Sequence, residues 1–327
     1  MNFQNLIDNI GQSTIDGLAK GAVFALVALG YTLVYGVLRL INFAHSEVFM
    51  VGTFTILGTW TLLGATNNPG IGVAILFMLA GLLAAALACG GTALLIERVA
   101  YRPLRKKNAP PLIFLITAIG ISIVLQEVFG LLLARGLGPW HGFGRPFGRL
   151  IVNLPSMLKS EPLITIGNAH ITNVQLLVIL AALAMMIGLD AFINRTRYGR
   201  GVRAVAQSPD TAALMGVNQD RVIMLIFVLG GMMAGGAALL HALQYGFTKF
   251  DIGFVLGLKA FTAAVLGGIG NLRGALLGGL VLGIVEVYWS TMFNSNWEDV
   301  ASFVVLVVVL MFRPTGLLGE SLGRARA

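Results

Sequence analysis

Charged side chains are scarce in this sequence. Asp, Glu, Lys and Arg together make up 11% of its 327 residues, whereas ordinary soluble domains contain about 25%. Hydrophobic residues make up 57%, and the mean hydropathy is +0.86. Cysteine is nearly absent as well, and with Cys89 alone no disulfide can form within the chain. The composition excludes a water-soluble fold and predicts an all-α, polytopic integral membrane protein.

Motifs for catalysis and nucleotide binding are also missing. No G-x-S-x-G or H-E-x-x-H motif occurs, and the histidines lack metal-ligand spacing. No lysine follows a glycine, so the G-K-[ST] motif of ATP-binding loops is absent. The cluster Gly267, Gly268 and Gly270 resembles a dinucleotide loop only superficially, because Arg273 stands at the third glycine position. We expect no enzyme activity, no catalytic residue, no bound cofactor and no metal site.

Long apolar stretches dominate the rest of the chain. A bilayer-spanning helix needs about 20 mostly apolar residues. Nine stretches are candidates: 14–38, 43–63, 71–96, 112–134, 173–193, 222–245, 254–269, 275–293 and 300–312. The seventh and ninth are short, and polar residues interrupt the start of the second, so eight spans with one broken or re-entrant helix is nearly as good an interpretation as nine. In both interpretations residues 1–327 form a single transmembrane domain.

Basic residues indicate how these spans cross the membrane. If nine spans alternate in direction, fifteen of the 22 Lys and Arg residues fall on one face: Arg39, Arg98, Arg102, Arg105, Lys106, Lys107, Arg195, Arg197, Arg200, Arg203, Arg221, Arg273, Arg313, Arg324 and Arg326. By the positive-inside rule this face is cytoplasmic. The N-terminus is then outside and the C-terminus inside. The net charge of +8 is explained by the basic residues on the cytoplasmic face, so we expect no nucleic-acid partner.

The connection 136–172 falls on the extracytoplasmic side in this threading. Its aromatic residues Trp140, Phe143 and Phe147 suit a membrane interface. Residues 163–166 and 169–172 flank Gly167-Asn168 and predict a small hairpin.

The basic connection 194–221 contains a short predicted helix over residues 209–215. Ser208 suits the N-cap, Pro209 the first helical position, Asp210 the positive end of the helix dipole, and Gly216 a left-handed stop. Such a helix is too short to be stable alone. Its apolar residues Ala212, Leu214 and Met215 must contact either the membrane surface or its own bundle, or a groove on a motor subunit.

Polar residues at membrane depth are candidates for a translocation path. Asn42, His45 and Glu47 lie where the first two spans meet, and Lys259 lies in the seventh. His45 could line the path or make a structural hydrogen bond. Lys259 is more often a snorkelling residue near the outer interface, and Glu286 is either its partner or faces a hydrated cavity.

Small residues suggest both close helix packing and internal symmetry. Three pairs of glycines spaced four residues apart favour close contact between helices: Gly231/Gly235, Gly274/Gly278 and Gly279/Gly283. A less favoured interpretation places the last pair at a contact with a partner permease. Segments 41–53 and 257–274 both mix small and polar residues and run in opposite directions. An inverted repeat and the absence of a repeat explain these two segments equally well.

Five segments of the chain resemble LivH-type permeases of branched-chain amino acid ABC importers. They are GAVFALVALGYTLVYGVLRLINFAHSEVFMVGT (21–53), ERVAYRPLR (97–105), TRYGRGVRAVAQSPDTAALMGVNQDRV (196–222), GLKAFTAAVLGGIGNLRGALLGG (257–279) and FRPTGLLG (312–319). Asp210, Thr211, Ala212 and Gly216 look like a degenerate form of the E-A-A-x-x-x-G coupling signature of ABC permeases. Ser46 departs from the family, which usually has Gly after N-F-A-H.

The resemblance implies the fold of a type II ABC importer permease, located in a bacterial inner membrane and surrounded by lipid. It implies import of leucine, isoleucine and valine, or of a close relative such as another small amino acid, an amide or urea, by alternating access. The implied partners are a related second permease, two cytoplasmic ATPases that contact the helix 209–215, and an extracytoplasmic substrate-binding protein. The alternative is an ion-coupled secondary transporter or channel for small neutral solutes such as urea or amides. Few acidic residues lie well inside spans, Glu127 and Glu286 being the clearest, which argues against it.

Overall fold

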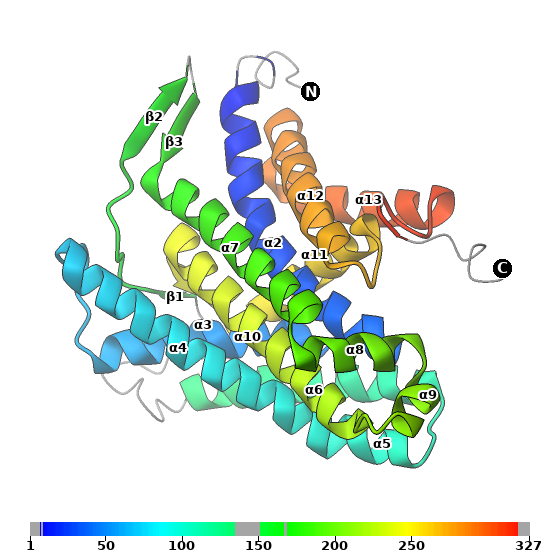
Figure 1. The fold of residues 1–327 in the computed structure, drawn as a ribbon. Coiled ribbons are helices and arrows are strands. Elements are labelled where there is room, and N and C mark those ends of the chain that lie inside the picture. Colours follow the sequence, from blue (N-terminus) through cyan, green and yellow to red (C-terminus); the bar gives the residue numbers. More distant parts are fainter. Residues whose placement is uncertain (1–6, 8, 135–150, 167–168, 320–327) are drawn as a thin grey trace.

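The computed structural model describes residues 7, 9–134, 151–166 and 169–319 as a bundle of helices with two small sheets (Figure 1). The helices are α2 (Ile10–Leu38), α3 (His45–Leu62), α4 (Ile71–Ile96), the π-helix η1 (Glu97–Tyr101), α5 (Arg102–Lys106), α6 (Pro111–Ala134), α7 (Asn173–Arg195), α8 (Arg197–Gln207), α9 (Pro209–Leu214), α10 (Gln219–Tyr245), α11 (Ile252–Gly267), α12 (Leu272–Met292), the 3₁₀-helix η3 (Ser295–Trp297) and α13 (Glu298–Phe312).

Seven helices in the described part of the chain are long and apolar enough to cross a membrane. They are Ile10–Leu38, Ile71–Lys106, Pro111–Leu131, Asn173–Arg195, Gln219–Tyr245, Leu272–Met292 and Ser295–Phe312. The shorter apolar helices α3 and α11 fill the two remaining predicted stretches. The prediction of an all-α, multi-span membrane bundle is confirmed, whereas the count of eight to nine spans stays a prediction, because seven of the described helices are long and apolar enough to span.

Helices α2 and α10 form the centre of the bundle. In an apolar 18-residue window of each helix, 83% of the residues are buried in α2 and 67% in α10. The corresponding share is 17% in the spans that contain α4, α6 and α13. Helix α2 contacts α12, α10, α11 and α7, and α4 and α6 expose apolar side chains on the outside. A helix that is buried on all sides must have small residues wherever another helix crosses it.

Glycine provides this close approach between α2 and α12. A Cβ on Gly21 would lie 2.6 Å from the carbonyl oxygen of Gly279, and a Cβ on Gly283 would lie 2.3 Å from the carbonyl oxygen of Gly17. The backbones of the two helices are therefore in contact. The packing interpretation of Gly279/Gly283 is confirmed, and the alternative contact with a partner permease is wrong, because α2 of the same chain occupies that face.

The Gly231/Gly235 pair makes a second contact of this kind, between α10 and α4. A Cβ on Gly231 would lie 2.5 Å from the carbonyl oxygen of Cys89, and one on Gly235 would lie 2.7 Å from that of Ala85. The third pair, Gly274/Gly278, faces α11. All three spacings therefore serve packing within the chain.

One end of the bundle carries both sheets (Figure 1). Strands β2 (Pro162–Ile166) and β3 (Ala169–Thr172) pair antiparallel, which confirms the predicted hairpin. Strand β1 (Val152–Asn153) pairs with β4 (Phe247–Thr248), directly after α10. The hairpin is joined to the start of α2, because the His170 amide donates to Gln12 at 2.8 Å. The interfacial aromatic residues predicted at 140, 143 and 147 and the turn residues 167–168 lie outside the described residues.

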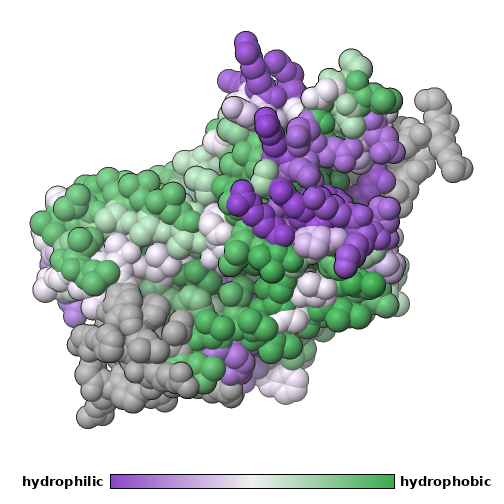
Figure 2. Space-filling model, turned by 90° about the horizontal axis from the view of Figure 1, so that it is seen from below, coloured by the Kyte–Doolittle hydropathy of each residue, from purple (hydrophilic) through white to green (hydrophobic). Residues whose placement is uncertain are grey.

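The opposite end carries the two basic connections. Arg105, after the third span, forms an ion pair with Asp220 at the start of α10, and Arg273 pairs with Asp190 of α7 at 3.5 Å. The amides of Leu317 and Leu318 donate to the carbonyls of Leu266 and Gly267 at the end of α11. Figure 2 shows hydrophilic residues gathered on part of this face. The predicted placement of both basic loops at one end is confirmed; Arg324 and Arg326 lie outside the described residues.

The two segments that mix small and polar residues lie against each other. A Cβ on Gly253 would lie 2.5 Å from the carbonyl oxygen of Ser46, and one on Gly257 would lie 2.1 Å from the Ser46 Cβ. Helices α3 and α11 therefore meet near the start of α3. An inverted repeat that relates them stays a prediction.

Replacing Gly279 with valine should destabilise the bundle, because its side chain would overlap the backbone of α2 around Ala25. Overpacking of this kind costs about 1–3 kcal/mol. Gly188→Val on α7 is the matched control, since nothing lies within 4 Å of a Cβ there. Thermal unfolding in detergent should show a lower midpoint for Gly279→Val alone. Equal midpoints for the two variants would contradict the α2–α12 contact.

Candidate translocation and coupling sites

The first candidate site is the polar segment that leads into α3. Asn42, His45, Ser46 and Glu47 are between 0% and 3% exposed. Helix α2 ends at Leu38, its C-cap Arg39 adopts a left-handed conformation with φ 52°, and α3 begins only at His45. The predicted interruption at the start of the second span is therefore present, and its polar side chains point into the protein.

Asn42 and His45 connect this segment to different neighbours. The Tyr101 hydroxyl, on η1, donates to Asn42 Oδ1 at 3.0 Å. The His45 ring lies edge-on to Tyr31 at a centroid distance of 5.1 Å and against Gly30 of α2, where a Cβ would lie 2.0 Å from Nε2. Both residues hold the segment in place between α2 and η1.

Glu47 points toward α6 and binds two polar side chains that sequence reasoning did not identify. Its Oε1 accepts from Gln126 Nε2 at 2.8 Å and from Ser122 Oγ at 3.2 Å. Its Oε2 is buried without a hydrogen-bond partner among the described residues. The i, i+4 spacing of Ser122 and Gln126 within an apolar helix was the available signal, because it places both on one face.

A cavity of about 500 Å³ lies beside Glu47. It is lined by Tyr31, Phe43, Ser46, Ile119, Ser122, Ile123, Gln126, Phe254 and Leu258. Most of this lining is apolar, and the hydroxyl and amide groups that bind Glu47 form its polar part. The cavity therefore combines an apolar wall with a buried carboxylate behind it, between α2, α3, α6 and α11.

Ser46 fits at its position because α11 has glycine opposite it. The Ser46 Oγ donates to the Phe43 carbonyl at 2.7 Å, and Gly257 leaves space for its Cβ. The departure from the family's usual glycine is thus accommodated without a clash.

Lys259 lies in a separate, buried ion cluster between α2, α11, α12 and α13. Its Nζ is 3.2 Å from Glu286, 3.1 Å from Glu298 and 2.7 Å from Asp299. Lys20 also pairs with Glu286 and Glu298. Lys259 is 7% exposed and Glu286 is fully buried. The snorkelling interpretation of Lys259 is therefore wrong, and Glu286 is its partner.

The second candidate site is the capped helix α9. Ser208 Oγ accepts from the Thr211 amide at 3.4 Å, Pro209 begins the helix, and Gly216 follows it with φ +82°. Gln219 Nε2 donates to the Pro209 carbonyl at 2.7 Å and holds the helix beside α10. The predicted caps are confirmed, and the helix ends one residue earlier than predicted, at Leu214.

The apolar residues of α9 divide between two directions. Ala212 is 4% exposed and packs against the bundle, whereas Leu214 and Met215 are 88% and 81% exposed. Asp210 in the first turn is also exposed. The helix therefore presents two large apolar side chains outward from the basic end.

Comparison with known families decides what kind of protein carries these sites. Residues 13–310 match the family described as the branched-chain amino acid transport system / permease component. The chain belongs to this family. It is a multi-pass transport permease and not an enzyme, and the ion-coupled alternative is not favoured. Within the part of the chain that the structure describes, no three His, Cys, Asp or Glu residues are grouped to hold a metal ion.

Relatives of this permease match nearly the whole chain. The high-affinity branched-chain amino acid transport system permease protein BraD of Pseudomonas aeruginosa is 40% identical over 94% of this chain and 95% of its own length. The permease protein LivH of Escherichia coli K12 is 40% identical over the same shares. A probable branched-chain amino acid transport permease, LivH of Methanocaldococcus jannaschii, is 25% identical over 96% of this permease and 95% of its own length.

Removing Lys259 should destabilise the permease, because Glu286 and Glu298 would share only Lys20 and Asp299 would lose the cation that it pairs with. Breaking a buried ion pair costs about 3–5 kcal/mol, and we expect Lys259→Met to fall near the lower value because Lys20 stays paired. The control is Lys249→Met, since Lys249 is 34% exposed and pairs with Asp251 near the surface. That pair contributes at most about 1 kcal/mol. Thermal unfolding in detergent measures the difference, and an unchanged midpoint for Lys259→Met would show that the cluster is not stabilising.

Proposed function

We propose that this chain is the transmembrane permease subunit of an ABC importer for leucine, isoleucine and valine. The observation that carries the proposal is the 40% identity, over nearly the full length of both chains, to BraD and LivH. Its proposed location is a bacterial inner membrane, with the N-terminus outside and the basic end cytoplasmic.

The geometry of α9 supports ATP-driven coupling through this helix. Leu214 and Met215 are more exposed than apolar side chains of this size usually are without a partner. We infer that they enter a groove on a cytoplasmic ATPase, while Ser208, Pro209, Asp210, Ala212 and Gly216 fix the helix that carries them. Two such ATPases, one for this chain and one for a related second permease, would drive alternating access.

The cavity beside Glu47 is the part of the proposed translocation path that the geometry supports best. An amino acid with an apolar side chain carries an ammonium and a carboxylate, and a buried carboxylate is the natural acceptor for the ammonium. Glu47 Oε2 has no hydrogen-bond donor among the described residues, and the apolar lining suits the side chain. Asn42 and His45 position the segment that carries Glu47. Lys259 does not line this cavity, so a role for it in the path would require its ion cluster to open.

Affinity for the solute is proposed to reside mainly in an extracytoplasmic substrate-binding protein. A tight site normally has several convergent polar groups, and this cavity offers few. The receptor would dock at the end that carries the β2–β3 hairpin, where the described residues 151–166 and 169–172 of this connection lie.

Single cysteines should reveal the orientation. Cysteines at Gln207 and Lys107, both exposed at the basic end, should react only from the cytoplasmic side, and one at Ser156 only from outside. The native Cys89 is buried and donates to the Val48 carbonyl, so its background labelling should be small. Impermeant reagents applied to intact spheroplasts and to inverted vesicles make the measurement. Labelling of Gln207→Cys in intact spheroplasts would reverse the proposed orientation.

Leu214→Glu should abolish transport and release the ATPase subunits, because an unpaired charge buried in an interface costs several kcal/mol. The permease itself should remain folded, since Leu214 is 88% exposed. Gln207→Glu adds the same charge just before α9 and should retain the ATPases. Co-purification and uptake are the measurements. Normal uptake by Leu214→Glu would assign α9 to the membrane surface instead.

Uptake in liposomes tests the solute and the path together. Permeases and ATPases should import micromolar leucine only when the receptor is present. Glu47→Gln should lower uptake roughly tenfold or more, because a charge-assisted hydrogen bond to the ammonium is lost, while the ATPases remain bound. Asp190→Asn, at the ion pair with Arg273 and away from both the cavity and the hairpin end, is the control. Receptor-independent micromolar uptake would move the specificity site into this permease.

A further inference from the structure

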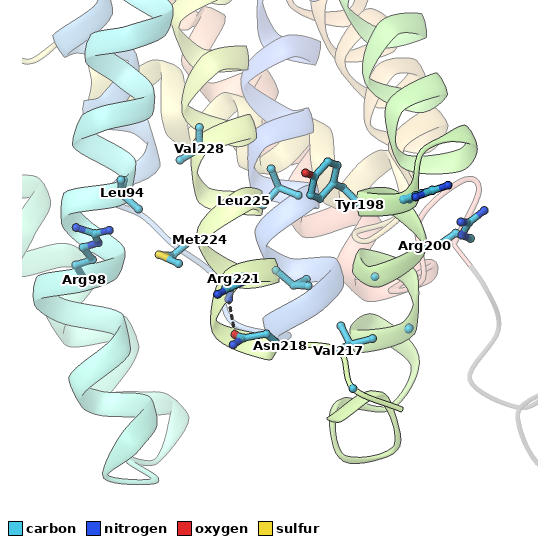
Figure 3. A pocket seen from close by; sticks show the side chains of 15 residues that line it. Leu94, Arg98, Tyr198, Arg200, Val217, Asn218, Arg221, Met224, Leu225 and Val228 are labelled. Carbon is cyan, nitrogen blue, oxygen red and sulfur yellow. Dashed lines mark hydrogen bonds between the residues drawn. The ribbon is translucent and has the colours of Figure 1, made fainter. Parts of the chain in front are cut away.

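A groove of about 790 Å³ crosses the basic end of the bundle, from α4 over the first turns of α10 to α8. It is separate from the cavity beside Glu47 and does not include α9. Figure 3 shows Arg98 on η1, directly after α4, and Arg221 on α10 at either side of Met224, with Leu94, Leu225 and Val228 farther from the basic end. Arginines thus line the part of the groove nearer the basic end, and the part farther from it is apolar.

The groove exists because α4 and α10 separate as they approach the basic end. Their backbones are in contact at Gly231 and Cys89. At Gly90 a Cβ would lie 3.5 Å from side-chain atoms of Met232 and Val228 and 3.6 Å from the Val228 carbonyl oxygen, which is ordinary van der Waals distance. One turn farther, at Leu94 and then at Arg98, the groove has opened.

Four arginines line the groove: Arg98, Arg197, Arg200 and Arg221. All four are exposed, and within the described ranges none of them forms a salt bridge. The nearest acidic residues are engaged elsewhere, because Glu97 pairs with Arg102 and Arg105, and Asp220 pairs with Arg105. No acidic residue lines the groove. Its open end is therefore strongly positive.

The rest of the groove suits hydrocarbon. The lining area is mainly apolar and comes from residues such as Leu94, Leu225 and Val228 on the surfaces of the spans. Tyr198, 71% exposed, also lines the groove, and tyrosine is enriched where membrane proteins meet the lipid headgroups. A ligand that fits must carry negative charge at one end and an apolar chain at the other.

We propose that this groove is a binding site for one anionic phospholipid, with its phosphate between Arg98 and Arg221 and an acyl chain along Leu94, Leu225 and Val228. Guanidinium groups bind phosphate oxygens in a bidentate manner, and basic pockets between transmembrane helices are suited to anionic headgroups. An ATPase surface would match the arginines but not an apolar trough that continues toward the bilayer. The proposal depends on membrane insertion and not on the transported solute.

Lipid titration by native mass spectrometry tests this site. The full-length chain, purified in detergent with its co-purifying subunits and delipidated, is titrated with phosphatidylglycerol and with phosphatidylcholine. Arg98→Gln/Arg221→Gln should lower the affinity for phosphatidylglycerol by about tenfold or more and leave phosphatidylcholine binding unchanged. Arg195→Gln/Arg313→Gln removes two exposed arginines from the same end but outside the groove, and should change the affinity by less than about twofold.

A second variant separates the loss of charge from a loss of folding. Ala204 lines the groove on α8, so Ala204→Trp should fill it and displace phosphatidylglycerol without removing any arginine. Soluble glycerol phosphate should fail to compete with the lipid, because it lacks the acyl chain.

Three outcomes would overturn the proposal. The first is unchanged phosphatidylglycerol affinity in both Arg98→Gln/Arg221→Gln and Ala204→Trp. The second is competition by glycerol phosphate at concentrations comparable to the lipid, which would make the groove an anion site only. The third is release of the ATPases by Arg98→Gln/Arg221→Gln with lipid binding intact, which would assign the groove to the ATPase.

Discussion

The close backbone contact of α2 with its neighbours is the constraint on which the rest of the bundle depends. Gly17 and Gly21 bring α12 against α2, and Gly30 receives the His45 ring from the start of α3. Because lipid offers no hydrophobic driving force between helices, such van der Waals contact is a main source of association. The position of α3 follows from it, and so does the placement of Glu47 beside the cavity. A structural contact on one face of α2 thus sets the geometry of the proposed path on the other.

Periodicity and composition were sufficient for the spans and for the basic end, because hydropathy and charge placement are properties of local sequence. The caps of α9 were equally local, and Ser208, Pro209 and Gly216 act as predicted. Ser122 and Gln126 were missed because isolated polar residues in an apolar helix do not show which neighbour they face. Lys259 was misinterpreted as snorkelling because its partners Glu298 and Asp299 lie beyond the next span in the sequence. Long-range pairing is what local patterns cannot report.

The two ends of the permease have different chemistry, and the membrane between them explains this difference. The end with the β2–β3 hairpin combines neutral hydrogen bonds, such as that between His170 and Gln12, with the exposed ion pair of Lys159 and Glu161. The basic end is held by ion pairs and carries unpaired arginines and two exposed apolar side chains on α9. The first pattern suits contact with a soluble protein that arrives and leaves. The second suits lasting contact with lipid headgroups and with a bound subunit.

The segment after α13 has a consequence for how the permease is made. Helix α11 ends at Gly267, and its last carbonyls, on Leu266 and Gly267, accept hydrogen bonds from Leu317 and Leu318, while Asn271 donates to the Leu318 carbonyl at 2.9 Å. These donors emerge from the ribosome only after about fifty further residues have been synthesised. The end of α11 therefore stays incomplete until residues 317 and 318 arrive. A chain cut before Leu317 would leave the carbonyls of Leu266 and Gly267 without these donors.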